Sequence, residues 1–222
     1  MEHEQINIRQ FKKLYVVRHG QTDFNHENRS QPATAGLSLK GQDQAKLLAQ
    51  RFRNFAVIPI ISSDMERASA TARAIAEVNG GAITFSELFR EVKRPSEIIG
   101  KLFADPAVNS IRLEMYAHAE ERMWHYSDEE NMFDLYARAL RARHLLEEFS
   151  GSHHIVVSHR VFIVMFFCAL ITEEEYAAMS LYWNIRRHMH LDNAGMTAFE
   201  LRDIDGYTQW RVRTWNDYAH LR

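Results

Sequence analysis

Short apolar segments rich in β-branched residues alternate along this chain with longer segments whose apolar residues recur at helical spacing. The five apolar segments span residues 14–17, 57–61, 82–85, 155–157 and 196–201. Strands separated by helices are typical of βαβ units, which build parallel sheets. The pattern therefore predicts an α/β fold, a three-layer sandwich in which a mostly parallel sheet is flanked by helices.

Several of the helical segments begin with a recognisable start signal. Three patterns resemble a capping box, in which the first and fourth side chains bind backbone N–H groups at the helix N-terminus: Ser63 with Glu66, Ser127 with Glu130, and Thr172 with Glu175. A fourth helix is expected from about Lys40, with a buried face made of Ala45, Leu48, Ala49 and Phe52.

About 40 residues separate the third apolar segment from the helix expected near Ser127. Ile98, Ile99 and Leu102, after Pro95, predict one helix in this stretch, and Met115, Ala119 and Met123 predict a second. Because the insertion, residues 90–126, follows a strand end, we expect it to form a lid. Only nine Gly and four Pro occur and no stretch is of low complexity, so residues 1–222 are expected to form a single domain.

Charge and hydropathy exclude several classes of protein. The 27 Lys and Arg against 29 Asp and Glu give a net charge of −2, which predicts no nucleic-acid partner. The longest apolar run, residues 161–171, is shorter than the roughly 20 residues of a membrane span, and residues 1–4 do not begin a signal peptide. No membrane partner is expected. The single cysteine, Cys168, favours a reducing, cytoplasmic location, and the sequence indicates no oligomeric state.

Histidine and arginine side chains follow three of the predicted strands. Arg18 and His19 follow the first, Arg67 lies in the first helical turn after the second, and His159 follows the fourth. Ligands of open α/β sheets bind outside the carboxyl ends of the strands, so these side chains should converge. Guanidinium groups hold phosphate oxygens bidentately, and a neutral histidine with a fixed tautomer can attack phosphorus. The residues therefore predict a site for a phosphoryl dianion, with one histidine as nucleophile and the other as an electrostatic clamp.

Ordered motifs between Leu14 and Leu221 support the same chemistry. Residues 18–25, RHGQTDFN, are similar to RHGxTxxN; residues 36–45 resemble PLSxxGxxQA; residues 62–72 resemble SSPLxRAxxTA; and residues 156–159 resemble a strand that ends in a second histidine. The tail from Asn193 through Asn216 to Leu221 also fits the closing pattern. On these motifs the chain resembles the histidine phosphatase superfamily, the phosphoglycerate-mutase-like group.

This resemblance implies a role for each matching position. His19 would form the phosphohistidine; the phosphoryl oxygens would be bound by Arg18, Arg67 and His159, with a hydrogen bond from Asn25. Glu91 matches the glutamate of the LxE pattern that serves as proton donor, although a solvated glutamate is an alternative for this position. The implied function is a metal-independent phosphomonoester hydrolase without a cofactor, acting on a small phosphorylated metabolite.

Two departures from the family pattern bear on the substrate. Arg160 stands where the family often has Gly, and residues 92–96 replace a GxWEG-like continuation. Lys93, Arg94 and Arg160 motivate the hypothesis that the substrate carries a second anionic group, so Arg94 and Arg160 are candidate substrate-binding residues. A phosphoglycerate-type mutase and a noncatalytic phosphate-binding regulatory module remain alternatives.

The other histidines lack the spacing of a metal site. His153, His154, His188 and His190 have neither the i,i+4 spacing with a carboxylate nor accompanying thiols, so they are expected to be structural or solvated. Residues 186–188, Arg-Arg-His, are expected to form a solvated helix face. Tyr116, Trp124 and Tyr126 in the insertion are expected to form its core or to shape the substrate pocket.

Overall fold

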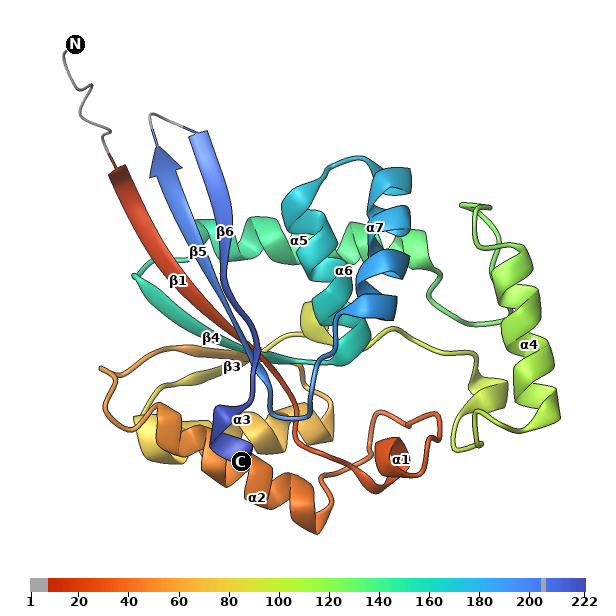
Figure 1. Ribbon diagram of the computed structural model, residues 1–222, viewed down its shortest axis with the longest axis horizontal. Coiled ribbons are helices and arrows are strands. Elements are labelled where there is room, and N and C mark those ends of the chain that lie inside the picture. The colour runs from red at the N-terminus through yellow and green to blue at the C-terminus, as the bar shows by residue number, and fades with distance from the viewer. Residues whose placement is uncertain (1–7, 205–206) are drawn as a thin grey trace.

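The computed structural model describes residues 8–204 and 207–222, and within them a single mixed sheet has the strand order β3-β2-β4-β1-β5-β6 (Figure 1). The strands are β1 (Ile8–Arg18), β2 (Ile60–Ser62), β3 (Ile83–Phe85), β4 (His153–Ser158), β5 (Met196–Ile204) and β6 (Tyr207–Asp217). The first four are parallel, whereas β5 and β6 pair antiparallel. The predicted α/β fold with a mostly parallel sheet is confirmed.

Helices cover both faces of the sheet (Figure 1). Helices α2 (Leu39–Arg51) and α3 (Glu66–Asn79) lie on one face, and α5 (Met132–Glu148), α6 (Arg160–Ile171) and α7 (Glu175–His188) on the other. Along β1, Leu14 and Val16 pack in the cluster of α5 to α7, while Tyr15 and Val17 pack in the cluster of α2 and α3. Both faces are buried, which explains the uninterrupted apolar run at this strand.

The sequence did not predict β6, and it placed the start of β2 too early. Val57 is exposed and precedes β2, which begins at Ile60. Strand β6 pairs on one side with β5 and ends the sheet. Most of its residues are partly or fully exposed, so it lacks the apolar run that identified the central strands.

Of the four predicted helix starts, only the one near Lys40 agrees with the structure. None of the three predicted capping boxes forms at the predicted residues. Helix α2 is capped by Ser38 and buries the predicted face of Ala45, Leu48, Ala49 and Phe52. The box predicted at Ser63 is wrong, because α3 begins at Glu66 after an N-cap, Met65, whose side chain makes no capping bond. Helix α5 is capped by a box of Asn131 and Asp134 and not by Ser127. Helix α7 begins at Glu175 with no side-chain cap.

The insertion between β3 and α5 contains less helix than predicted. The helix expected after Pro95 is only one 3₁₀ turn, η2 (Ser96–Ile98), preceded by another, η1 (Glu87–Phe89). Helix α4 (Pro106–Ala117) covers part of the second prediction but ends before Met123, which is exposed. Pro106 occupies the first turn of α4, where its missing N–H is not needed.

The insertion is tied to the loop after helix α1 (Asp23–His26) by backbone hydrogen bonds. Ser30 N donates to Lys101 O at 3.0 Å, Gly100 N to Ser30 O at 2.9 Å, and Phe103 N to Asn28 O at 2.9 Å. Two segments far apart in the sequence therefore meet beyond the carboxyl ends of the parallel strands. The chain closes with the 3₁₀ helix η3 (Ala219–Leu221) against α2.

Across the described residues, no helix combines the length and the apolar character needed to cross a bilayer. The apolar run at residues 161–171 belongs to α6, a helix of 12 residues buried in the core. The first four residues, where the absence of a signal peptide was predicted, lie outside the described part of the chain.

Candidate active site

The register of the sheet places the two motif histidines next to each other. Strands β1 and β4 are parallel, and Arg18 lies opposite Ser158. The residues that directly follow these two strands are His19 and His159, whose ring centroids are 5.0 Å apart. Their exposed fractions are 2% and 0%. The pairing of two strands distant in sequence thus builds a buried histidine pair at the carboxyl edge of the sheet.

The tautomer of His19 is fixed by its own backbone. Its Nδ1 lies 2.6 Å from the carbonyl oxygen of Gly20. A carbonyl oxygen can only accept, so Nδ1 carries the proton and Nε2 keeps its lone pair. Burial, followed by the charges of Arg67 and Arg18, holds the pKa of His19 well below its usual range. His19 is therefore a neutral imidazole with one free nitrogen, the form that a nucleophile requires.

The backbone around His19 is held from three directions. Gly20 N donates to Thr71 Oγ1 at 3.2 Å, and Asn193 Nδ2 donates to the carbonyl of His19 at 3.1 Å. Gly41 in the first turn of α2 approaches so closely that a Cβ on Gly20 would lie 2.4 Å from its carbonyl oxygen. These contacts explain why glycine occupies both positions.

Arg18 and Arg67 bring two buried guanidinium groups to His19. Arg18 Nη1 donates to Leu191 O at 2.6 Å, and Arg67 Nη1 donates to Pro32 O at 3.0 Å. The Nε atoms of both are buried without a hydrogen-bond partner in the described chain. Burial lowers the pKa of each to about 10, so both are charged at neutral pH. Two buried cations with unused N–H groups form a receptor for an anion.

His159 also leaves one nitrogen unused. Its Nε2 lies 2.9 Å from the hydroxyl of Ser63, while Nδ1 is buried with no partner among the described residues. Burial and the charge of Arg67 hold the pKa of His159 well below its usual range. Ser63 belongs to a motif that the sequence identified, but its contact with His159 could not be predicted because it joins β2 to β4.

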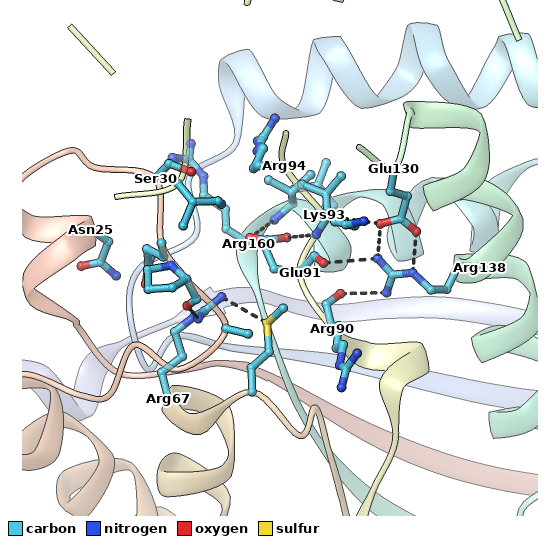
Figure 2. A pocket seen from close by; sticks show the side chains of 18 of the residues that line it. Asn25, Ser30, Arg67, Arg90, Glu91, Lys93, Arg94, Glu130, Arg138 and Arg160 are labelled. Carbon is cyan, nitrogen blue, oxygen red and sulfur yellow. Dashed lines mark hydrogen bonds and ion pairs between the residues drawn. The ribbon is translucent and has the colours of Figure 1, made fainter. Parts of the chain in front are cut away.

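Two smaller polar groups complete this part of the site (Figure 2). Asn25 Oδ1 accepts from Thr22 N at 3.2 Å in the capping box of α1, which leaves Asn25 Nδ2 buried and unpartnered in the described chain. Ser30 Oγ is likewise buried without a partner. The sequence carried no signal for Ser30, because only the hydrogen bonds to residues 100 and 101 bring it to the site.

Glu91 lies at the N-terminus of α6. Its Oε1 accepts from Phe162 N at 3.0 Å and from Val92 N at 3.1 Å, and its Oε2 accepts from Val161 N at 3.2 Å. These contacts satisfy two of the orphan N–H groups of the helix. Glu91 also lines the same pocket as Arg18 and Arg67. Its position thus allows both a structural and a chemical role.

The loop that carries Glu91 is held by a partly buried ion pair that the sequence analysis missed. Arg138 Nη1 donates to the carbonyl oxygens of Leu88 and Arg90, both at 2.8 Å. Its Nε and Nη2 donate to the two carboxylate oxygens of Glu130, both at 2.7 Å (Figure 2). No local pattern links these residues, since the contacts form only when α5 packs against η1.

A pocket of about 940 Å³ lies over these groups. Six of the predicted site residues line it, namely Arg18, Asn25, Arg67, Glu91, Arg94 and Arg160; His19 and His159 lie buried beside Arg18 and Arg67. The lining holds nine Arg and one Lys against four acidic residues, although the whole chain has a net charge of −2. The positive field is local, which suits an anionic ligand.

A comparison with family models matches residues 14–218 of this chain to the histidine phosphatase superfamily (branch 1). The chain belongs to this superfamily. The match begins within β1, continues past the end of β6 and includes the insertion.

Curated relatives and solved structures agree with the family assignment. This histidine phosphatase superfamily member is 28% identical over 223 residues to "Probable phosphoglycerate mutase GpmB" of Salmonella arizonae, covering 94% of each chain. It is 25% identical to a mycobacterial glucosyl-3-phosphoglycerate phosphatase, with a TM-score of 0.73 over 93% of this chain and 99% of the other. YhfR of Bacillus stearothermophilus shares the fold, with a TM-score of 0.77 at 22% identity over 95% of this chain and 100% of the other.

The structure corrects one prediction about the cations of this superfamily member. Residues 186–188 were expected to form a solvated face, but Arg186 lines the pocket, and only Arg187 and His188 are exposed. Arg186 Nη1 donates to the hydroxyl of Tyr182 at 3.1 Å. Helical periodicity points Arg186 and Tyr182, four residues apart, to the same side of α7.

Two histidines outside the site, on β4, pack against aromatic rings. His153 stacks on Tyr15 and His154 on Phe149, with ring centroids 6.4 and 5.5 Å apart. Within residues 8–204 and 207–222, no group of three or more His, Cys, Asp or Glu side chains is arranged to hold a metal ion. In the insertion, Trp124 stacks on His118 at 4.3 Å and Tyr116 packs on Trp183 of α7 at 5.6 Å.

Proposed function

We propose that this chain is a phosphomonoester hydrolase that acts on a small phosphorylated metabolite through a phosphohistidine at His19. The observation that carries the proposal is the neutral imidazole of His19, with its free Nε2, beside the buried guanidinium groups of Arg18 and Arg67. The superfamily assignment and the solved phosphatases of the same fold support it.

In the first step, the lone pair of His19 Nε2 attacks phosphorus and the ester P–O bond breaks. The carboxyl group of Glu91 gives its proton to the leaving oxygen, so that an alcohol departs. The unused N–H groups of Arg18, Arg67 and Asn25, together with His159 Nδ1, hold the phosphoryl oxygens. The burial of these unused donors in the fold supports such a role, because donors that are already held cost little to organise when the substrate binds.

In the second step, water attacks the phosphohistidine. The Glu91 carboxylate takes one proton from this water, the P–N bond breaks, and its electron pair returns to His19 Nε2. Inorganic phosphate leaves, with Glu91 protonated and His19 neutral for the next turnover. No metal takes part in this sequence of steps, because His19 supplies the nucleophile and the arginines neutralise the phosphoryl charge.

Trapping the intermediate tests the proposal. A brief pulse of a labelled phosphomonoester, followed by denaturation, should leave a protein-bound phosphate that is acid-labile and base-stable. His19→Ala should show neither the label nor turnover, whereas the matched control His144→Ala, an exposed histidine on α5, should show both. Turnover retained in His19→Ala would remove His19 from the mechanism.

Glu91 requires a separate test because its contacts also make it a cap of α6. Glu91→Gln keeps an oxygen acceptor for Phe162 N but cannot transfer a proton. An alkyl phosphate needs a proton donor far more than p-nitrophenyl phosphate, whose leaving group is a stable anion. If Glu91 is the acid, Glu91→Gln should lower kcat roughly 100-fold or more for the alkyl ester and much less for the aryl ester. An equal loss on both esters would leave only the structural role.

A phosphoglycerate-type mutase is the second candidate, favoured by the name of the Salmonella arizonae relative. A mutase uses the same first step but returns the phosphoryl group to the rebound product. Release of inorganic phosphate without a bisphosphate primer supports the hydrolase, and isomerised phosphoester without phosphate release supports the mutase. Binding of phosphoesters without any turnover would favour the noncatalytic module.

The proposal also covers the insertion and the domain organisation. Residues 90–126 would act as a lid, since their contacts with residues 28–30 lie at the rim of the pocket. Residues 1–222 would form one domain.

Location and partners follow from composition. A cytoplasmic location is consistent with a single cysteine, Cys168, that is buried and whose pKa burial raises to about 12. The negative net charge argues against a nucleic-acid partner.

A further inference from the structure

Besides Arg18 and Arg67, three partly buried guanidinium groups of the pocket form no ion pair with a carboxylate in the described chain, unlike several of its other cations. Arg90 pairs with Asp64, Lys93 with Asp128 and Arg138 with Glu130. In the described chain, by contrast, no ion pair joins a carboxylate to the pocket residues Arg94, Arg160 and Arg186. Arg141 also lines the pocket without an ion pair in the described chain, but it is exposed on α5. The charges of Arg94, Arg160 and Arg186 therefore come in addition to those of Arg18 and Arg67 at the histidine pair.

Arg160 occupies a position where a cation is unfavourable. It is the first residue of α6, and a positive charge at a helix N-terminus opposes the helix dipole. Arg160 also acts against Arg18: after burial, its charge is the next cause of the lowered pKa of Arg18. A bound anion between these groups would remove both penalties, so the arrangement favours a ligand with negative charge at this end of the pocket.

Arg186 is held in place without an ion pair. Its Nη1 donates to Tyr182 Oη, and its guanidinium carbon lies 5.6 Å from the ring centroid of Trp183. Arg94 extends from the segment that carries Glu91, and Figure 2 shows Arg94 and Arg160 around the same pocket as Arg67. A guanidinium that is oriented by neutral partners keeps its charge available for a ligand and loses little entropy on binding.

From this arrangement we infer that Arg94, Arg160 and Arg186 form a second anion subsite, and that the substrate is a phosphomonoester whose leaving group carries a second phosphoryl group. The inference rests on the proposed function for the position of the reacting phosphoryl group. Three guanidinium groups without a carboxylate ion pair match a phosphoryl dianion with three oxygens better than a carboxylate, which carries one charge and two oxygens. A pocket of about 940 Å³ has room for a metabolite with two such groups.

A set of substrates with one three-carbon frame tests the subsite. Propyl phosphate, 3-phosphonooxypropanoate and propane-1,3-diol bisphosphate differ only at the third carbon, which is a methyl group, a carboxylate carbon or a CH2 group that carries a second phosphate ester. We expect kcat/KM to be highest for the bisphosphate, roughly 10- to 100-fold above propyl phosphate, the range expected for hydrogen bonds to a charged group.

Variants connect this preference to the named residues. In Arg186→Gln and Arg160→Gly, the ratio of kcat/KM for the bisphosphate to kcat/KM for propyl phosphate should fall roughly tenfold. Arg187→Gln, the exposed neighbour on α7, should leave the ratio unchanged. The ratio compares two substrates on the same protein, so a variant that is partly unfolded still gives a valid result, and Arg94→Gln replaces any variant that does not fold.

Three results would overturn the inference: equal kcat/KM for all three substrates, a carboxylate preferred over the bisphosphate, or an unchanged ratio in both variants. Failure of the proposed function looks different, because wild type would then hydrolyse none of the three. In that case, calorimetry measures the binding of propane-1,3-diol bisphosphate to wild type and to Arg186→Gln. Weaker binding to Arg186→Gln supports the anion subsite, and equal binding to both proteins overturns it.

Discussion

Arg138 and Glu130 form a bidentate ion pair behind the loop that carries Glu91, with both N–O distances at 2.7 Å. The exposed fractions of their side chains are 11% and 15%. Arg138 also donates to the carbonyl oxygens of Leu88, Arg90 and Glu91, so one side chain on α5 holds the segment that carries the candidate acid.

Removal of Arg138 should destabilise the protein strongly. In Arg138→Met, Glu130 loses its partner and three loop carbonyls lose a donor, so the free energy of unfolding should fall by about 3–5 kcal/mol. The double variant Glu130→Gln/Arg138→Met should recover part of this loss because the uncompensated charge is gone. Urea denaturation measures the free energy of unfolding of the single and the double variant. Arg141→Met, which replaces an exposed arginine on α5, is the control. If Arg138→Met lowered the free energy of unfolding by less than about 1 kcal/mol, the pair would contribute no more than an ordinary surface ion pair.

The close approach of Gly41 to the His19 loop predicts a second loss. A Cβ at Gly41 would lie 1.9 Å from the carbonyl oxygen of Gln21, whereas a Cβ at Gly36 meets nothing within 4 Å. Gly41→Ala must push residues 20 and 21 away, which we expect to cost about 1–3 kcal/mol of stability and to lower kcat by displacing His19. Gly36→Ala should keep the wild-type stability and kcat. Thermal melting and aryl phosphatase assays compare the two variants. If Gly41→Ala were as stable and as active as Gly36→Ala, the close contact at Gly41 would be contradicted.

The hydrogen bond between Ser63 and His159 predicts a positioning role for Ser63. Ser63→Ala frees His159 Nε2 and lets the ring rotate, so kcat should fall roughly 10- to 100-fold. The free energy of unfolding should fall by about 1–3 kcal/mol, because Met65 N and His159 Nε2 both lose their partner. Ser62→Ala is the matched control, because the Ser62 hydroxyl is equally buried and bonds only to Ser63 O. A changed pH profile of kcat in Ser63→Ala, absent in Ser62→Ala, separates positioning from a packing defect.

The buried histidine pair predicts how stability depends on pH. The pKa values of His19 and His159 lie well below the unfolded value of about 6.5, mainly because of burial. Below pH 6.5 the unfolded chain binds protons at these positions and the native chain does not. Stability is therefore fully present above pH 6.5 and is lost as pH falls, by about 1.4 kcal/mol per pH unit for each histidine.

Chemical denaturation between pH 7 and pH 5, in phosphate-free buffer, measures this slope. The variant His159→Gln should reduce it by one histidine's share, and His144→Gln serves as the exposed control. A wild-type slope unaffected by His159→Gln would mean that His159 takes up a proton in the native protein, which would contradict the burial argument.

Much of the site followed from the sequence because its residues lie next to recognisable strands. The apolar segments at residues 14–17 and 155–157 end directly before His19 and His159, and parallel strands bring their carboxyl ends to one edge. The α/β fold and the superfamily were predictable for the same reason: strand patterns and motifs are local properties of the chain. The helix starts predicted at residues 63 and 127 were wrong, because in the folded protein α3 begins at Glu66 and α5 is capped by Asn131.

Only the tertiary structure decided which side chains share the pocket. Ser63 meets His159 across two strands, Ser30 is brought in by residues 100 and 101, and Arg138 reaches the Glu91 loop from a helix some 50 residues away in sequence. The sequence pattern assigned Arg186 to solvent, yet α7 turns it toward the pocket. Such contacts depend on how the elements pack against each other. No repeating pattern in the sequence marks residues that meet only through this packing.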